Sequence, residues 1–296
     1  MSAKTGIQWT QRIWNPVRGI LDDYLGTLNV RSFSAPLKWR GFGRVALGFD
    51  LFYETISESA IDRVFAVMGL APRYTFQVLT KSPERMLNYC KTLGRHHSID
   101  RVSLEAKKLN AKSGFTWSHG AGGWHLPNVW LGVSVENQEA ADERIPHLLA
   151  TPAALRFLSV EPLLGPVDLR FCVASSICYD RDPEEDSPVA TLACPSGRHW
   201  VNQCEHVIHT CGVDWVIVGG ESGPGARPCD LDWIRSIVKQ CHAAGVNCFV
   251  DQLGRHPFDT NDLNPFMWLR DRKGGDPSEW PEGLRVREMP TAKGGA

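Results

Sequence analysis

Six segments of the sequence each run through several apolar residues and end in an ionisable side chain. Nearly continuous apolar runs of this length are typical of strands buried on both faces of a parallel sheet. In parallel α/β folds, ligands bind at the carboxyl ends of the strands, so the terminal side chains are candidate ligand-binding groups. The segments are Val45–Asp50, Phe76–Lys81, Val129–Glu136, Leu155–Glu161, Trp215–Glu221 and Val246–Asp251.

Six ionisable groups at one edge of a sheet are costly to desolvate unless each finds a partner. For any single one, a helix cap or a structural ion pair explains the residue about as well as a ligand does. For all six together, a ligand site is the better explanation. Three carboxylates, Glu136, Glu161 and Glu221, are expected to converge, so at least one should be protonated, hydrogen-bonded or paired with a cation. Lys81 and Arg227 are the candidate cations.

A glycine-rich stretch, Val218–Gly225, follows one of these runs. Glycines directly after a strand allow close approach of the backbone to a ligand, and free N–H groups can cradle an anion or a carboxylate. The stretch matches neither the dinucleotide fingerprint nor the phosphate-binding P-loop. Two other runs end in Ser-x-Glu, which makes the stretch part of a pattern. The predicted small-molecule site therefore comprises Asp50, Lys81, Glu136, Glu161, Gly219, Gly220, Glu221 and Ser222.

A second candidate site lies in a segment rich in cysteine and histidine. Zinc needs four such ligands in a tetrahedron, and a structural zinc could hold together a loop that has little core of its own. The alternative is a surface loop of biased composition, since the segment has no C-x-x-C pair. The candidate ligands are Cys194, Cys204, His206, His209 and Cys211.

Helical patterns separate the apolar runs. A helix is expected from Ser57 to Met68 with Gly69 ending it, and another is expected to begin at Ser82-Pro83. A third spans Asn137 to Ala150, where Pro146 should kink or end it. A fourth spans Asp230 to Ala244, with Gly245 as the stop. Strands that alternate with helices predict βαβ units, hence an α/β fold with a parallel sheet.

The 296 residues fit one domain, because an α/β barrel takes about 250 residues. Irregular insertions are expected at about 95–127 and 171–213, and an irregular tail from about 259 is expected to wrap the surface. Lys and Arg total 32 against 33 Asp and Glu, so net charge gives no reason to expect nucleic acid or an anionic membrane. Without a signal peptide or an apolar stretch of about 18 residues, the protein is expected to be cytoplasmic, with no membrane partner.

Motifs spread along the whole chain resemble a known family. They include WNPVRG (14–19), TFQVLTKSPERM (75–86), RFLSVEPLLGPVDL (156–169), DWVIVGGESGPGARP (214–228) and EWPEGLRVREMP (279–290). The sequence resembles the phage family named after gene products thirty-seven and sixty-eight, a domain of unknown function related to radical-SAM enzymes such as spore photoproduct lyase. The resemblance implies a partial or complete parallel (β/α) barrel of radical-SAM type. It also implies a [4Fe–4S] cluster on three cysteines after the first strand, S-adenosylmethionine at the strand ends and, by analogy alone, a nucleic-acid partner.

The cluster is not expected in this chain. In the family a cysteine-rich loop follows the WNP motif, whereas here residues 20–26 read ILDDYLG and the first cysteine is Cys90. Iron–sulfur clusters need soft thiolate ligands. The family's Lys-Gln-Trp-Gly after the last strand is also Asp251–Gly254 here, and its Ser-Asp-Leu-Phe-His is Phe49–Tyr53.

Three functions remain open at this point. The first is a radical-SAM-like protein that has lost its cluster, and is therefore a degenerate or pseudo-enzyme. The second is a module that binds S-adenosylmethionine or a nucleotide without redox chemistry. The third is a hydrolase that uses the strand-end carboxylates with a divalent metal ion.

Overall fold

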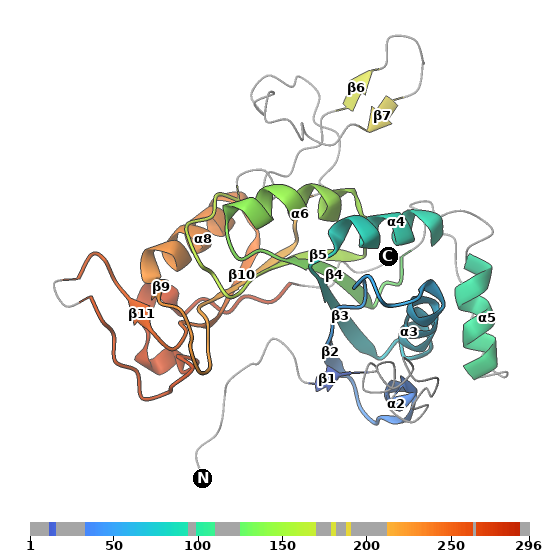
Figure 1. The fold of residues 1–296 in the computed structure, drawn as a ribbon, viewed down its shortest axis with the longest axis horizontal. Coiled ribbons are helices and arrows are strands. Elements are labelled where there is room, and N and C mark those ends of the chain that lie inside the picture. Colours follow the sequence, from blue (N-terminus) through green and yellow to red (C-terminus); the bar gives the residue numbers. More distant parts are fainter. Residues whose placement is uncertain are drawn as a thin grey trace. The chain divides into compact units, whose positions relative to one another are not determined.

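The computed structural model describes residues 12–15, 33–93, 99–109, 125–169, 179–181, 188–190, 212–262 and 265–290. Seven strands form one parallel sheet in the order β1-β2-β3-β4-β5-β8-β10, with helices beside it (Figure 1). The expected α/β class and the six neighbouring parallel strands are confirmed, while the first strand was not expected. The strands are β1 Arg12–Trp14, β2 Gly43–Leu47, β3 Tyr74–Thr80, β4 Val129–Ser134, β5 Leu155–Val160, β8 Trp215–Gly219 and β10 Asn247–Gln252.

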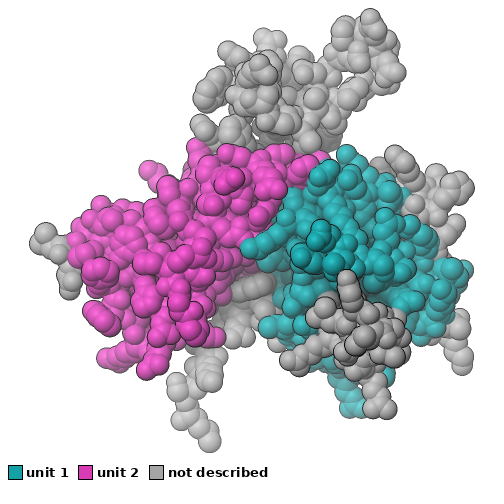
Figure 2. Space-filling view, viewed as in Figure 1, with its two compact units in different colours: residues 1–133, 151–155 teal, residues 134–150, 156–296 magenta. Residues whose placement is uncertain are grey.

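The central strands β4 and β8 are apolar and buried on both faces of the sheet. Every residue of β4 and of β8 is buried, as the unbroken apolar runs predict for a parallel sheet. The chain divides into two compact units, shown in two colours in Figure 2. Unit 1 comprises residues 1–133 and 151–155, and unit 2 comprises residues 134–150 and 156–296.

Unit 1 contains the helices α2 Ala35–Lys38, α3 Glu58–Leu70, α4 Pro83–Leu93 and α5 Ile99–Leu109. Ser57 caps α3, since its hydroxyl accepts the N–H of Ala60 at 3.2 Å. The expectation that Gly69 ends this helix is wrong. The buried side chain of Asn128 instead donates to the carbonyl groups of Met68 and Tyr74, both at 3.0 Å, and so satisfies the helix end from outside. The insertion at 95–127 is not wholly irregular either, because it contains α5.

Unit 2 contains the helices α6 Gln138–Ala150 and α8 Leu231–Ala244. Pro146 does not end α6, which buries Ile145 and Leu148 on either side of it. Asp230, expected as the first residue of α8, instead caps its start, and Gly245 ends the helix as expected, with a φ of 67°. The remaining elements are β6 Tyr179–Arg181 paired with β7 Pro188–Ala190, β9 Cys229–Asp230 paired with β11 Pro257–Phe258, and the short 3₁₀ turns η4 Pro277–Glu279 and η5 Glu282–Leu284.

The C-terminal tail does more than wrap the surface. Trp280 and Leu284 are buried, and the N–H of Val250 in β10 donates to the carbonyl group of Val286 at 2.8 Å. These two apolar side chains add to the core beside β10, a role that was not expected of the tail. Among the described residues, no helix is long and apolar enough to cross a membrane.

Candidate functional site

The most unusual side chain at the strand ends of unit 2 is Glu161, which directly follows β5. The side-chain amide of Gln252, at the end of β10, donates to Glu161 Oε1 at 2.7 Å and to the carbonyl group of Gly220 at 3.1 Å. Burial and the neighbouring charge of Asp251 raise the pKa of Glu161 to about 8, and the hydrogen bond from Gln252 acts in the opposite direction. Glu161 is therefore mostly a neutral acid at pH 7.

Asp251 contributes a second carboxyl group beside Glu161. The guanidinium group of Arg287 donates to the carbonyl oxygen of Asp251 at 3.0 Å and lies over the rings of Phe249 and Trp280, at 5.0 and 5.1 Å. Burial lowers the pKa of Arg287, and the charge of Asp251 acts in the opposite direction. Asp251 thus has a nearby cation, whereas an amide is the hydrogen-bond partner of Glu161.

Glu221, which follows β8, is neutralised within its own loop. Its carboxylate accepts hydrogen bonds from Arg227 Nε at 2.7 Å, Nη2 at 3.0 Å and the backbone N–H at 2.8 Å. The side-chain hydrogen bonds, then the backbone one, lower the pKa of Glu221 to about 2. Arg227 was one of the two predicted partners, and here it closes the glycine-rich loop as an internal bidentate clamp.

Glu136, which follows β4, pairs with a residue that the sequence reasoning missed. Arg144 Nη1, on α6, donates to Glu136 Oε2 at 2.9 Å and to the carbonyl group of Ser134 at 2.9 Å. Arg144 lies eight residues after Glu136, and a helix that starts directly behind a strand can bring such a residue back to the strand end. The charge of Glu136 also reaches Arg227, which places the Glu136 and Glu221 ion pairs near each other.

Gly219 at the end of β8, and Gly220 directly after it, allow the close contact between β8 and β10. A Cβ atom on Gly220 would lie 2.3 Å from the carbonyl oxygen of Leu253, and one on Gly219 would lie 2.9 Å from that of Gln252 and 3.3 Å from Glu161 Cδ. The N–H of Gly220 donates to the carbonyl group of Gln252 at 3.0 Å, so this N–H does not cradle a ligand as the sequence suggested. Ser222 is half-buried in the loop that follows.

In unit 1, Asp50 joins the ends of two strands. Its carboxylate accepts hydrogen bonds from the N–H of Phe52 at 3.0 Å, the hydroxyl of Thr80 at 2.6 Å and the N–H of Lys81 at 2.8 Å. These contacts give Asp50 a structural role in the turn after β2. The side chain of Lys81 is exposed. That Asp50 and Lys81 bind the same ligand as the glutamates of unit 2 stays a prediction.

The cysteines that the structure describes lie in the interior of the protein. Cys90, Cys229, Cys241 and Cys248 are all buried, and burial raises the pKa of the Cys90 thiol and brings that of Cys229 to about 12. The predicted zinc ligands, Cys194, Cys204, His206, His209 and Cys211, lie outside the described residues. Within the described residues, no three His, Cys, Asp or Glu side chains are grouped so that they could hold a metal ion.

Comparison with protein families matches residues 25–289 to a family described as a protein of unknown function (DUF5131). Comparison with curated proteins found no match, and comparison with solved structures found none either. The family match covers most of the chain, from before β2 to the end of the described tail. The chain therefore belongs to the DUF5131 family of proteins of unknown function.

Proposed function

We propose that this chain is a radical-SAM-like protein without an iron–sulfur cluster, and that it binds S-adenosylmethionine or a related cationic nucleoside at the strand ends of unit 2. One observation carries the proposal, namely the Glu161 carboxyl group held beside Asp251 with a pKa of about 8. Perturbed acids of this kind are concentrated at binding and catalytic sites. In a protein without the cluster, these carboxyl groups can still recognise a cation.

The charges explain why a cation is the favoured ligand. Glu221 and Glu136 are already neutralised by Arg227 and Arg144. Glu161 keeps its proton because burial, and then the neighbouring charge of Asp251, make its ionisation unfavourable. A sulfonium or ammonium group bound there would lower the pKa of Glu161 and displace the proton. S-adenosylmethionine carries both of these groups.

Proton release gives a direct test. With a pKa of about 8, Glu161 is about nine-tenths protonated at pH 7, so ligand binding should release nearly one proton. Isothermal titration in buffers of different ionisation enthalpy measures that number. S-adenosylhomocysteine is the matched ligand, because it has the same nucleoside and amino acid but no sulfonium charge. It should bind more weakly and release fewer protons.

Two matched variants distinguish the loss of this binding site from the effect of replacing any glutamate. Glu161→Gln should weaken S-adenosylmethionine binding at least about tenfold and abolish the proton release, because one carboxylate partner is lost. Glu139→Gln, at an exposed position at the start of α6, should leave both unchanged. The proposal fails if the wild-type protein binds neither nucleoside, or if Glu161→Gln binds S-adenosylmethionine as tightly as the wild type.

The alternative of a metal-dependent hydrolase is less well supported. Its carboxylates would have to be available to a metal ion, but Glu136 and Glu221 are each engaged with an arginine. The degenerate-enzyme hypothesis and the binding-module hypothesis differ only in whether chemistry follows binding, so the titration bears on both.

A further inference from the structure

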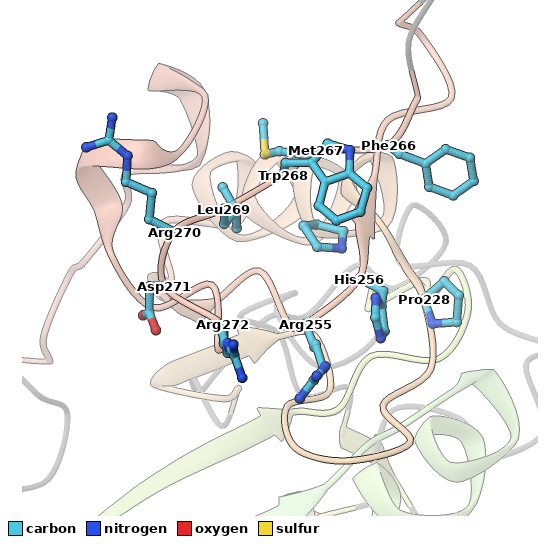
Figure 3. A pocket seen from close by; sticks show the side chains of 11 residues that line it. Pro228, Arg255, His256, Phe266, Met267, Trp268, Leu269, Arg270, Asp271 and Arg272 are labelled. Atoms are coloured by element: carbon cyan, nitrogen blue, oxygen red, sulfur yellow. The ribbon is translucent and has the colours of Figure 1, made fainter.

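The C-terminal part of unit 2 holds an open pocket of about 570 Å³, and its lining does not include Glu161, Asp251 or Gln252. Arginine, histidine and aromatic side chains line it. In Figure 3, Arg255, His256 and Arg272 lie on one side of the pocket and Phe266, Met267 and Trp268 lie on the other. The lining thus combines cationic groups with flat apolar faces.

The residues from Phe266 to Arg272 alternate in exposure with a period of two. Phe266, Trp268, Arg270 and Arg272 are exposed, and the three residues between them are half-buried. The alternation faces the aromatic and cationic side chains outward and turns the others toward the protein. Trp268 is 93% exposed and Phe266 is 67% exposed, which is unusual for two large apolar side chains placed two residues apart.

The acids that the structure describes near this surface bind backbone N–H groups and form no ion pair with its arginines. Among the described residues, no carboxylate pairs with the guanidinium groups of Arg255, Arg270 or Arg272. The carboxylate of Asp271 instead accepts the N–H groups of Lys273 and Gly275, at 3.1 and 2.8 Å. That of Glu279 accepts the N–H groups of Arg270 and Asp271, at 2.9 and 3.2 Å. Both carboxylates thus accept hydrogen bonds from backbone N–H groups, and the side chains of the three arginines are exposed to solvent.

The backbone that carries these side chains is tied to the rest of unit 2. The N–H of Met267 donates to the carbonyl group of Pro257 at 3.2 Å, and that of Leu253 donates to the carbonyl group of Gly274 at 2.9 Å. The N–H of Arg255 donates to the carbonyl group of Glu221 at 2.8 Å. The exposed side chains are therefore presented on a supported segment.

We propose that this surface binds single-stranded nucleic acid. Unpaired bases would stack on Trp268 and Phe266, and the phosphates between them would contact Arg255, Arg270 and Arg272. Single-stranded nucleic acids are bound by aromatic faces interleaved with cations. Such a surface accepts many base sequences, because every base has a face that can stack. An apolar protein partner would not need three unpaired guanidinium groups, and an acidic peptide would not need the exposed rings.

The test is fluorescence anisotropy of a labelled 12-nucleotide single strand of mixed sequence, as DNA and as RNA, with the full chain at about 50 mM salt. Trp268→Ala should weaken binding at least about fivefold, from the loss of one stacked base, and Trp268→Phe should restore most of it. The double variant Arg255→Ala with Arg272→Ala should reduce the slope of log affinity against log salt by about 1.4, which is about 0.7 for each phosphate contact.

Two controls separate binding at this surface from general effects of charge and of stability. Lys239→Ala removes an exposed cation on α8, outside the pocket, and should change the affinity little. The exposed Trp268 contributes little to the core, so the Trp268→Ala protein should keep its thermal midpoint. The proposal is overturned if neither single strand binds, if Trp268→Ala binds as well as the wild type, or if a duplex or an acidic peptide binds as tightly as the single strand.

Discussion

Replacing Glu161 with glutamine should make the stability of the protein less dependent on pH. The folded protein raises the pKa of Glu161 to about 8, whereas an exposed glutamate in the unfolded chain titrates near 4.5. The native state therefore holds a proton that the unfolded state has already lost. The favourable contribution of the neutral acid is complete below about pH 4.5 and disappears as the pH rises through about 8. Glutamine cannot ionise, so the variant escapes that loss.

The size of the effect follows from the difference between the two pKa values. A difference of roughly 3.5 pKa units corresponds to about 5 kcal/mol at 1.36 kcal/mol per unit. The side chain is half-buried, and solvent that reaches it screens the repulsion from Asp251. We therefore expect about 2–3 kcal/mol in practice. The free energy of unfolding of Glu161→Gln, relative to the wild type, should rise by that amount between pH 5 and pH 9.

Urea unfolding followed by tryptophan fluorescence at pH 5, 7 and 9 measures this difference. Glu139→Gln is the matched control, since it makes the same change at an exposed position and should track the wild type at every pH. The compared quantity is the free energy of unfolding of Glu161→Gln minus that of the wild type. If it rises by less than about 0.5 kcal/mol from pH 5 to pH 9, which is near the error of the extrapolation, Glu161 does not have a raised pKa and the reasoning is wrong.

Two further predictions concern the packing that holds the strand ends. Asn128→Ala should destabilise the protein by about 2–3 kcal/mol in urea unfolding, because the buried amide donates to three backbone carbonyl groups. A loss no larger than that of Asn88→Ala, at an exposed position, would contradict this. Gly220→Ala should cost about 1–3 kcal/mol or more, since its Cβ would lie 2.3 Å from the carbonyl oxygen of Leu253. Gly283→Ala should be neutral, because its Cβ would have no atom within 4 Å. Equal thermal midpoints for Gly220→Ala and Gly283→Ala would contradict the prediction, because they would show that the backbone between β8 and β10 shifts at no cost.

Much of the fold could be predicted from the sequence because its signals are local. A strand buried on both faces must be apolar throughout, so β4 and β8 can be recognised from their own residues. The stop at Gly245 depends only on neighbouring backbone groups, and this prediction is correct. The prediction for Gly69 failed because α3 continues to Leu70, where Asn128 donates to the carbonyl group of Met68 and no local pattern connects this residue to the helix.

The sequence by itself determined the parallel α/β class, the acidic strand ends and the absence of cysteine before Cys90. Only the tertiary structure decided which acid keeps its proton. Arg144 and Arg227 lie near Glu136 and Glu221 in the sequence, but Gln252 meets Glu161 from 91 residues away. The pKa of a carboxyl group depends on its burial and on every charge around it, and those surroundings are assembled only when distant strands pair. Glutamates that look alike in the sequence therefore differ in the folded protein.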